Sequence, residues 1–442
     1  MTGAPPPPVV RHLDLRDAVA IYAGIILGSG VFLAPSAVAG ATASPSGAIL
    51  IWLAGAIVAG CGAACYAECA GRMPHNGGFF AFHREVYGPA VAFVGGWVSL
   101  LITYPASVAA IALVLAGYAT QAAGWDGGER GLAAGALLAA GLLNVAGLRT
   151  GPRAQRVLTT VKVAAVLALA LGVAAAGRGA ISPPVEAPAA MPQAAGWLTA
   201  ALAMLWSYDG WSDVTLVAGE IREPSRNLGR TVVLGTLLLF AVYAVVQVSV
   251  LVALPGGRAA ASTRPFADAV TAVLGSGAGR AVSGLVVIST FGAIVGTVLT
   301  VSRLAAAMAG SGALPPAVGA VHPVLGTPAR AVGLVTAAAL VYVASASFRE
   351  ILAYFTFAVW IFYGLTAVAL LRLRRRRIGE PVAWRAPLGA LPPAVVLASG
   401  GVLVTSLVRE SPGRAAIGGA LLAAGFPVFV VLRRWGVVSR SR

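Results

Sequence analysis

Apolar runs of about twenty residues recur along the whole chain, and they constrain its fold more than any other feature. Each run is long enough to cross the hydrocarbon core of a bilayer as a helix. Because that core offers no water to unpaired backbone groups, runs of this kind must be helical. Charged residues make up only 10% of the 442 positions, too few to cover the surface of a soluble protein of this length. The sequence therefore predicts an all-α integral membrane protein.

The runs predict about twelve transmembrane helices. Their expected ranges are 17–41, 46–70, 89–120, 131–148, 156–177, 195–220, 230–254, 279–309, 329–346, 349–371, 389–408 and 414–432. No soluble domain fits between them, because the longest intervening segments have only about twenty residues. These segments are 71–88, 178–194, 255–278 and 372–388.

Arginine is divided unevenly between alternate sides of the expected spans. The 31 basic residues include one lysine, which leaves 30 arginines. With the N-terminus in the cytoplasm, 22 arginines lie inside and 8 outside, as the positive-inside rule favours. We therefore expect a multi-pass plasma-membrane protein whose cytoplasmic tails are residues 1–16 and 433–442. The N-terminal segment has no apolar core, so no cleaved signal peptide is expected.

The net charge of +16 does not indicate nucleic-acid binding, because the arginines lie between apolar runs. The basic run 374–377 is interpreted as an anchor at anionic lipid headgroups. All four histidines are expected in or beside extramembrane segments, so no histidine relay within the membrane is predicted. They are His12, His75, His83 and His322.

Three cysteines share one helix face. Cys61, Cys65 and Cys69 have the i, i+4, i+8 spacing that suits packing against a neighbouring helix. A metal site would need histidine or acidic partners, and only Glu68 is close in sequence. Neither a metal site nor a cofactor is expected.

Two of the apolar runs are interrupted by polar or flexible residues. The first contains Gly28-Ser29-Gly30, and each glycine weakens a helix by roughly 1 kcal/mol. The sixth contains Asp209 within residues 206–213, and an aspartate there costs about 2.5–3.5 kcal/mol on insertion scales. Taken singly, the glycines are also compatible with close helix packing, and Asp209 with a hydrogen bond to a neighbouring helix. An unwound helix lining a cavity accounts for both.

The pair of interruptions is more informative than either alone. They lie about 180 residues and five spans apart, which indicates two five-helix repeats that each begin with a broken helix. The repeats are assigned to residues 17–177 and 195–371, followed by two C-terminal helices within residues 389–432.

Broken helices of this kind can bind a zwitterion through their exposed backbone groups. Amides at the start of one half-helix bind an anion, and carbonyls at the end of another bind a cation. We expect the amides of Ser29, Gly30 and Val31 to bind a carboxylate. The carbonyls of Trp206, Ser207 and Asp209 are expected to bind an ammonium group. Gly28, Tyr208 and Ser212 complete the expected substrate-binding set.

These residues also carry a family resemblance. Gly-Ser-Gly-Val-Phe at 28–32 resembles the first-helix motif of the amino acid–polyamine–organocation superfamily. Residues 208–228, from Tyr-Asp-Gly-Trp to Ala-Gly-Glu-Ile-Arg-Glu-Pro-Ser-Arg-Asn-Leu, resemble its L-amino-acid transporter branch and related bacterial permeases. Stretches within 66–97, 289–315 and 384–392 agree. The resemblance implies the five-plus-five inverted-repeat (LeuT-like) fold with discontinuous helices 1 and 6, and secondary amino-acid transport by alternating access.

The chain departs from this family at positions that affect selectivity. Members of the transporter branch often have asparagine where Ser212 stands and another near Val295 in the eighth span, and Trp206 occupies an aromatic gate position that is often phenylalanine. Neutral L-amino acids are the preferred substrates, because Asp209 is also common in similar neutral permeases. A cationic amino acid or a polyamine is the alternative, since Asp209 and Asp213 both lie at the sixth-helix break.

Lys162 is the only lysine and lies inside the fifth expected span. One interpretation is that its side chain extends to the cytoplasmic surface. The other, which the resemblance supports because many bacterial members carry a lysine here, is that its ammonium replaces a sodium ion. It would then bridge the carbonyls near Gly24 to the hydroxyl of Ser289 or Thr290. This implies sodium-independent transport, either proton-coupled or by exchange.

Two acid–base pairs lie near cytoplasmic ends of spans: Glu68 with Arg72, and Glu220 with Arg222. Local ion pairing or an opening and closing gate network would account for them. Animal members of the branch use a cysteine after the third span to join a heavy subunit, and residues 121–130 contain none. No disulfide-linked partner is therefore expected; the expected partners are the amino-acid substrate and the bilayer.

Other function classes fit the sequence less well. A channel or energy-coupling subunit would require a chain of buried acids and histidines, which are sparse here. A sensor built on a transporter scaffold would carry an added soluble domain, and an ATP-driven pump would carry a phosphate-binding G-x-x-x-x-G-K-[ST] motif. Neither feature is present, and no enzymatic activity is predicted.

Overall fold

The computed structural model describes residues 11–42, 44–125, 127–146, 152–176, 193–255, 257–320, 322, 327–345, 348–410 and 412–434. The parts of the sequence outside these ranges include the first ten residues, Arg149, most of the expected loop 178–194, and the tail beyond Arg434.

The described chain is helical throughout, apart from turns and one isolated bridge between Leu13 and Ile221. Its first half contains α1 (Leu15–Ile26), α2 (Gly30–Ala41), α3 (Pro45–Arg72), α4 (Phe79–Tyr87), α5 (Pro89–Val98), the π-helix η1 (Ser99–Thr103), α6 (Tyr104–Ala123), α7 (Glu129–Val145) and α8 (Pro152–Ala176). Its second half contains α9 (Gln193–Tyr208), the 3₁₀-helix η2 (Asp213–Glu220), α10 (Pro224–Ala253), α11 (Arg258–Ala261), α12 (Pro265–Leu274), α13 (Ser276–Gly310), α14 (Pro316–Gly319), α15 (Ala329–Ser345), α16 (Phe348–Arg376), α17 (Leu391–Glu410) and α18 (Pro412–Arg434).

Local sequence signals fix where the long helices begin. Asp14 caps α1 by accepting a hydrogen bond from the Asp17 amide, and the Asp17 side chain reciprocates. This amide hydrogen bond also lowers the pKa of the Asp14 carboxyl. Ser44 caps α3 by accepting a hydrogen bond from the Gly47 amide, and a proline at the first helical position begins both α3 and α10. Proline suits this position because its missing N–H would have no partner there.

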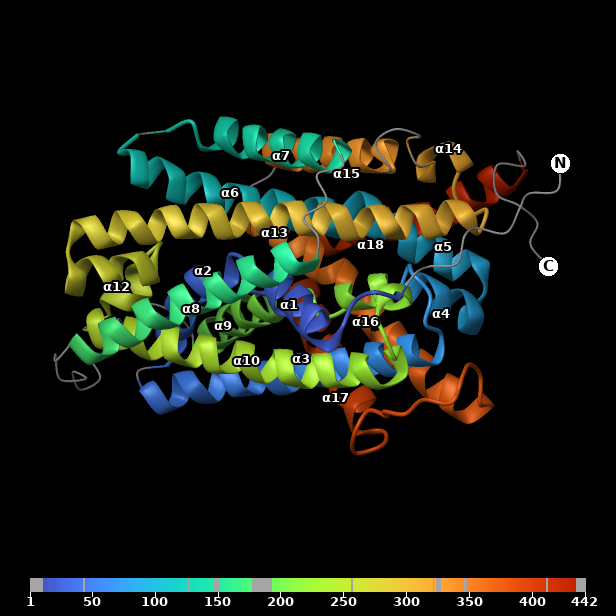
Figure 1. The fold of residues 1–442 in the computed structure, drawn as a ribbon, viewed down its shortest axis with the longest axis horizontal. Coiled ribbons are helices and arrows are strands. Elements are labelled where there is room, and N and C mark those ends of the chain that lie inside the picture. The colour runs from blue at the N-terminus through green and yellow to red at the C-terminus, as the bar shows by residue number, and fades with distance from the viewer. Residues whose placement is uncertain are drawn as a thin grey trace.

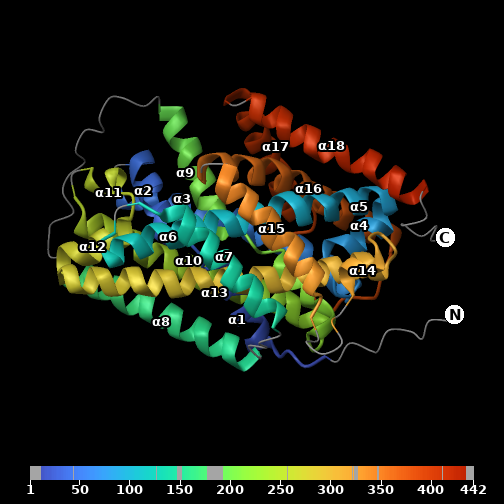
Figure 2. The same ribbon diagram turned by 90° about the horizontal axis from the view of Figure 1, so that it is seen from above.

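The helices pack side by side along the long axis of the molecule (Figure 1). α4 and the segment between α16 and α17 lie at one end, whereas α11 and α12 lie at the opposite end with the C-terminal part of α2 (Figures 1 and 2). Buried side chains of α1, α2, α3, α9 and α10 form much of the main core. A second core joins α6, α7, α13 and α15. The broken helices described below therefore lie inside the bundle.

The membrane character of the fold is confirmed. Among the described residues, eight helices are long and apolar enough to cross a membrane, and the bent pair α1–α2 would make a ninth span. α7, α9 and α15 are shorter, with 17, 16 and 17 residues. All three coincide with expected spans, so the number of about twelve stays a prediction.

Two features were absent from the sequence-based expectations. The third apolar run is interrupted by the five-residue π-helix η1, which connects α5 to α6. The segment between α10 and α13, expected as a loop, contains the ten-residue helix α12, which packs on α2, α10 and α13. The apolar face of α12, with Phe266 and Val270 fully buried, explains why it folds back onto the bundle.

Candidate functional site

The predicted break in the first span is present. α1 ends at Ile26, α2 begins at Gly30, and the two helices are bent by 54°. The turn between them uses the amides of Leu27, Gly28 and Phe32 for backbone hydrogen bonds. The amides of Ser29, Gly30 and Val31 have no backbone acceptor. The start of α2 therefore presents the free N–H groups that bind an anion.

The sixth span is interrupted at the predicted place. α9 ends at Tyr208, and the chain then passes through Asp209 and Gly210 before η2 begins at Asp213. Gly210 has a φ of +105°, a backbone conformation that residues other than glycine rarely adopt. A tight turn followed by a 3₁₀-helix thus replaces the continuous helix that hydropathy alone would give.

The two breaks meet inside the bundle. A Cβ atom at Gly30 would lie 2.6 Å from the hydroxyl oxygen of Ser207 and 2.7 Å from its Cβ. Contacts this short do not occur between real side chains, so only glycine permits α2 to approach α9 so closely. Gly30 therefore brings the free amides of α2 next to the end of α9.

A small cavity of about 60 Å³ lies between the breaks, enough for several water-sized groups. Six of the predicted substrate-binding residues line it: Gly28, Ser29, Gly30, Trp206, Asp209 and Ser212. Val31, Ser207 and Tyr208 are buried behind this lining. Ser29 has only 2% of its surface exposed, and its hydroxyl has no hydrogen-bond partner. Because such a buried hydroxyl is costly, the cavity is suited to a polar occupant.

The carbonyls predicted to bind an ammonium group are partly used within the protein. The carbonyl of Trp206 accepts the Asp209 amide at 3.1 Å, and that of Ser207 accepts the Tyr243 hydroxyl at 2.6 Å. The Tyr243 hydroxyl also lies 3.4 Å from the Ile26 carbonyl at the end of α1. One tyrosine of α10 thus contacts the C-terminal ends of both half-helices, and the sequence analysis did not identify it.

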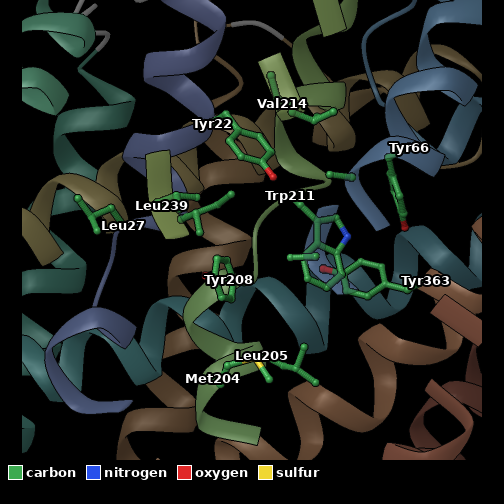
Figure 3. Packing of buried hydrophobic residues seen from close by; sticks show 14 of the residues in the cluster. Tyr22, Leu27, Tyr66, Met204, Leu205, Tyr208, Trp211, Val214, Leu239 and Tyr363 are labelled. Carbon is green, nitrogen blue, oxygen red and sulfur yellow. The ribbon is translucent and has the colours of Figure 1, made fainter. Parts of the chain in front are cut away.

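Aromatic rings hold the sixth-helix break in place. Trp211 packs against Tyr363 of α16 (Figure 3), and the two ring centroids lie 4.6 Å apart. On the other side, Tyr208 packs against Tyr243 at 4.9 Å and donates a hydrogen bond to the Trp52 carbonyl of α3. Trp206, the predicted gate, lines the cavity and packs edge-on against Phe355 of α16 at 5.0 Å.

Two carboxylates face the same cavity, each held by a tyrosine. Asp209 accepts a hydrogen bond from Tyr363 at 2.7 Å. Asp213 accepts one from Tyr104 at 2.9 Å and one from Ser212 at 3.1 Å. Tyr104 follows η1 directly, so the π-helix aligns a polar face of Ser99, Thr103 and Tyr104 with the cavity. π-Helical turns of this kind occur frequently at functional sites.

Lys162 lies in α8, outside the cavity. It is buried, and its ammonium donates a hydrogen bond to the Gly24 carbonyl of α1 at 3.4 Å, so the surface-reaching interpretation is wrong. The predicted bridge to α13 is not formed within the described chain. Thr290 instead donates to carbonyls of its own helix, and the buried hydroxyl of Ser289 has no partner.

At the α4 end of the molecule, Glu68 is the centre of a buried ion cluster. It is fully buried and accepts hydrogen bonds from Arg72, from Arg374 of α16 and from the Ala386 amide. The local Glu68–Arg72 pair is confirmed at 2.9 Å. The interpretation of the whole run 374–377 as a lipid anchor is wrong for Arg374, because its guanidinium joins α16 to α3.

Glu220, at the end of η2, forms a second cluster at this end. Its side chain pairs with Arg303 of α13 at 3.0 Å and accepts a hydrogen bond from Asn76. The local Glu220–Arg222 pairing is therefore wrong. The Glu220 carbonyl accepts the His12 and Leu13 amides, which attaches the chain before α1 to the same point. Elements from both halves of the sequence thus converge on Glu220.

His83 differs from the expectation for histidines. It lies on α4 with no exposed surface and is hydrogen-bonded to Thr366 of α16 at 2.8 Å. Cys65 and Cys69 are buried on α3 and Cys61 is half-buried, as the packing interpretation predicted. Within the described residues, no group of three or more histidine, cysteine or acidic side chains could hold a metal ion.

An apolar helical bundle with a cavity between interrupted helices is an arrangement that occurs in membrane transporters. The sequence profile of the family described as amino acid permease matches residues 13–428, so the chain belongs to this family of the amino acid–polyamine–organocation superfamily. The protein is thus an amino-acid permease of the membrane, in agreement with the resemblance of its motifs.

Curated relatives agree with this assignment. The chain is 28% identical to the serine/threonine exchanger SteT of Bacillus subtilis over 96% of this chain and 97% of that protein. It is 29% identical to the human b(0,+)-type amino acid transporter 1 over 84% of this chain and 78% of the relative. It is 27% identical to the rabbit large neutral amino acids transporter small subunit 2, over 96% and 81% of the two chains.

Proposed function

We propose that this protein transports neutral L-amino acids across the plasma membrane by alternating access, without sodium and as an exchanger or a proton symporter. One observation carries the proposal: the start of α2, whose first three amides have no backbone acceptor, lies beside the end of α9 at a small cavity that Ser29, Gly30 and Asp209 line. Relatives described as an exchanger of serine and threonine and as a transporter of large neutral amino acids support the substrate class.

The substrate would lie with its charged groups on the two helix breaks. Its carboxylate would accept hydrogen bonds from the amides of Ser29, Gly30 and Val31, supported by the Ser29 hydroxyl. Its ammonium would lie near the ends of α1 and α9, where the carbonyl of Ser207 retains one lone pair beside its bond to Tyr243. The side chain would then extend toward Trp206, Phe355 and Val359, which give the cavity its apolar part.

The inverted-repeat architecture belongs to the same proposal. The repeats 17–177 and 195–371 would place their broken helices, α1–α2 and α9–η2, at corresponding positions, with α17 and α18 outside the repeats. Segments 71–88 and 372–388, which would be cytoplasmic if the spans alternate from a cytoplasmic N-terminus, lie together at one end of the molecule, and α12 from segment 255–278 lies at the other (Figure 1). This agrees with the alternation of the expected spans, and the cytoplasmic position of residues 1–16 and 433–442 is part of the same proposal.

The ion clusters at the α4 end would form the cytoplasmic gate. The Glu220–Arg303 pair joins η2 to α13, and the Glu68–Arg374 pair joins α3 to α16. Inward opening would require the η2 end to separate from α13, and the chain before α1 would move with it through its Glu220 hydrogen bonds. We expect no disulfide-linked heavy subunit, because residues 121–130 contain no cysteine.

Counterflow in proteoliposomes tests the proposed function. Vesicles containing the full chain and loaded with one unlabelled amino acid should accumulate the labelled form of an accepted substrate transiently. A panel from glycine to tryptophan, with lysine, ornithine and putrescine added, identifies the substrate class. Accumulation limited to lysine, ornithine or putrescine would favour the second candidate, a cationic amino acid or polyamine transporter, for which Asp209 and Asp213 in the cavity are the supporting observation.

Transport is expected to continue without sodium, because the Lys162 ammonium contacts the Gly24 carbonyl where a cation would otherwise neutralise the end of α1. Initial uptake should change by less than about twofold when sodium is replaced by choline. A transporter that lost about 1.4 kcal/mol of substrate binding on removal of sodium would instead lose affinity about tenfold. Replacement by potassium controls for the choline ion itself. Loss of most uptake in both media would contradict the assignment.

Replacing Trp206 by alanine is expected to enlarge the accepted substrate range, because the indole lines the cavity against Phe355. The ratio of tryptophan to alanine uptake should rise by about tenfold, the equivalent of 1.4 kcal/mol. Trp197→Ala is a matched control, since Trp197 lies on the same helix with 52% of its surface exposed. Equal ratios of tryptophan to alanine uptake in the wild type and in Trp206→Ala would show that Trp206 only packs against its neighbours and does not select substrates by size.

A further inference from the structure

The cavity contains two acids and no base. Asp209 and Asp213 line it, and the described residues around it include no lysine, arginine or histidine. The titratable groups that face the two acids are tyrosines: Tyr66 from α3, Tyr104 from α6 and Tyr363 from α16. α1, α2 and α13 contribute only apolar side chains, glycines and hydroxyls to the lining, and α10 contributes none.

The protein supplies a few hydrogen-bond donors to each carboxylate, and for Asp209 these include the Gly210 backbone. The side chains donate to Oδ1 in each case: Tyr363 to Asp209, and Tyr104 and Ser212 to Asp213. The Oδ2 atom of Asp213 lies near Gly210, 3.9 Å from where a Cβ of that residue would be. Asp213 therefore lies close to the break at which the substrate ammonium is placed.

A neutral amino acid does not balance this charge. Its ammonium would offset one carboxylate, but its own carboxylate brings an equal negative charge to the start of α2. With both acids ionised, the occupied cavity would keep two uncompensated negative charges inside a bilayer, which is costly. A second buried group also indicates an occupant: the Ser29 hydroxyl, on the opposite wall, has no partner and 2% exposure.

We propose that the Asp209–Asp213 pair binds a proton that enters and leaves with the amino acid. The proton would reside on a carboxylate oxygen, and the tyrosine hydroxyls would stabilise the remaining negative charge by donating to Oδ1. The occupied cavity then carries one negative charge fewer, which lowers the free energy of the conformational change in the substrate-loaded protein. This inference rests on the proposed amino-acid transport and adds its coupling ion.

Proton movement and amino-acid movement are measured together in the test. Full-length protein is placed in vesicles that contain pyranine, a pH-sensitive dye, and an accepted neutral amino acid from the panel is added outside. The wild type should acidify the interior with a proton-to-amino-acid ratio near one. Asp213→Asn should lower this ratio at least fivefold in whatever flux remains. Asp268→Asn should keep it, because Asp268 lies on α12, outside the cavity, with its carboxylate bound to Ser262.

Tyr104→Phe provides a second variant that keeps both acids and the size of the side chain. It should move the midpoint of the pH–uptake profile to higher pH, because the ionised form of Asp213 loses a hydrogen-bond donor. An unchanged midpoint together with an unchanged ratio in Asp213→Asn would overturn the inference. It would equally be overturned if the wild type took up lysine in preference to norleucine without acidification, because the pair would then serve a cationic side chain.

Different results would contradict amino-acid transport and the proton site. If no amino acid gives counterflow in the wild type, the transport function itself is wrong, and this is known before any proton measurement. If counterflow is present but the interior is not acidified, transport stands and the proton site is wrong. If Asp213→Asn does not fold, as judged by gel filtration in detergent, the Tyr104→Phe profile alone decides.

Discussion

Replacing Gly30 by valine is expected to abolish substrate binding while the protein still inserts into the membrane. A Cβ at this position would lie 2.6 Å from the Ser207 hydroxyl, and the Ser207 backbone is closer still. Valine adds two further carbons, and overpacking of this kind costs typically 1–3 kcal/mol. The start of α2 must then move away from α9, which displaces the free amides from the cavity. The affinity should fall by at least about 100-fold, so a substrate concentration that just saturates the wild type leaves Gly30→Val almost unoccupied.

Thermal stabilisation by substrate is the measurement, because it reports binding without transport. The wild type should unfold at a higher temperature with saturating substrate, and Gly30→Val should show no increase. Gly40→Ala is the matched control. It places a methyl group on the same helix, where the nearest atom is 3.7 Å away, and should leave the stabilisation unchanged. Stabilisation of Gly30→Val equal to that of the wild type would mean that the carboxylate binds elsewhere.

The helix breaks could be predicted because their causes are local. Gly28-Ser29-Gly30 weakens a helix through its own composition, and Asp209-Gly210 combines a charge with a residue suited to positive φ. Long apolar runs likewise define the helices within a few residues at most ends. These features require no knowledge of which helices are neighbours.

The groups that complete the site could not be predicted, because their partners are remote in sequence. Tyr104 lies 109 residues from Asp213, Tyr363 lies 154 from Asp209, and Tyr243 reaches back to the ends of α1 and α9. In an apolar run, a tyrosine that donates to a carboxylate is indistinguishable from one that only packs.

Two other differences have identifiable physical reasons. The sequence places Arg374 in a basic run and predicts a lipid anchor. Its pairing with Glu68 becomes apparent only when α16 is seen to pack beside α3, where the buried carboxylate needs a second cation. The π-helix η1 had one available signal, Pro105, which lacks an N–H and whose ring crowds the carbonyl of residue 101 in a regular helix. In both cases the residue is visible in the sequence, but its partner or its effect on the helix depends on the folded structure.

Replacing Lys162 by alanine is expected to preserve substrate binding and to remove most transport. Lys162 does not line the cavity, so affinity should remain within about threefold of the wild type, less than 1 kcal/mol. Its ammonium, however, is the group of α8 that contacts the Gly24 carbonyl near the end of α1, one turn from the Thr159–Ala20 hydrogen bond. α1 is the half-helix expected to move during inward opening, so losing this contact changes the balance between the two states.

Thermal shift for affinity and proteoliposome uptake from pH 5 to 8 are measured on the same variant. Uptake by Lys162→Ala should fall at least tenfold, whereas Thr159→Val, which removes only the neutral hydrogen bond to α1, should fall much less. Lys162→Arg tests whether charge alone is sufficient. Normal affinity with unchanged uptake and pH profile would exclude a role in coupling.

The pH dependence of the remaining uptake separates the two buried groups. If Lys162 carried the transported proton, Lys162→Ala would transport slowly and without response to a pH gradient. If the Asp209–Asp213 pair carries it, the residual uptake should still be driven by the gradient, because both carboxylates and their tyrosine donors remain in place. Lys162 would then control the conformational change by its contact with α1, and the acids would provide the coupling ion. The double variant Lys162→Ala with Asp213→Asn should lose the response to pH that Lys162→Ala alone retains.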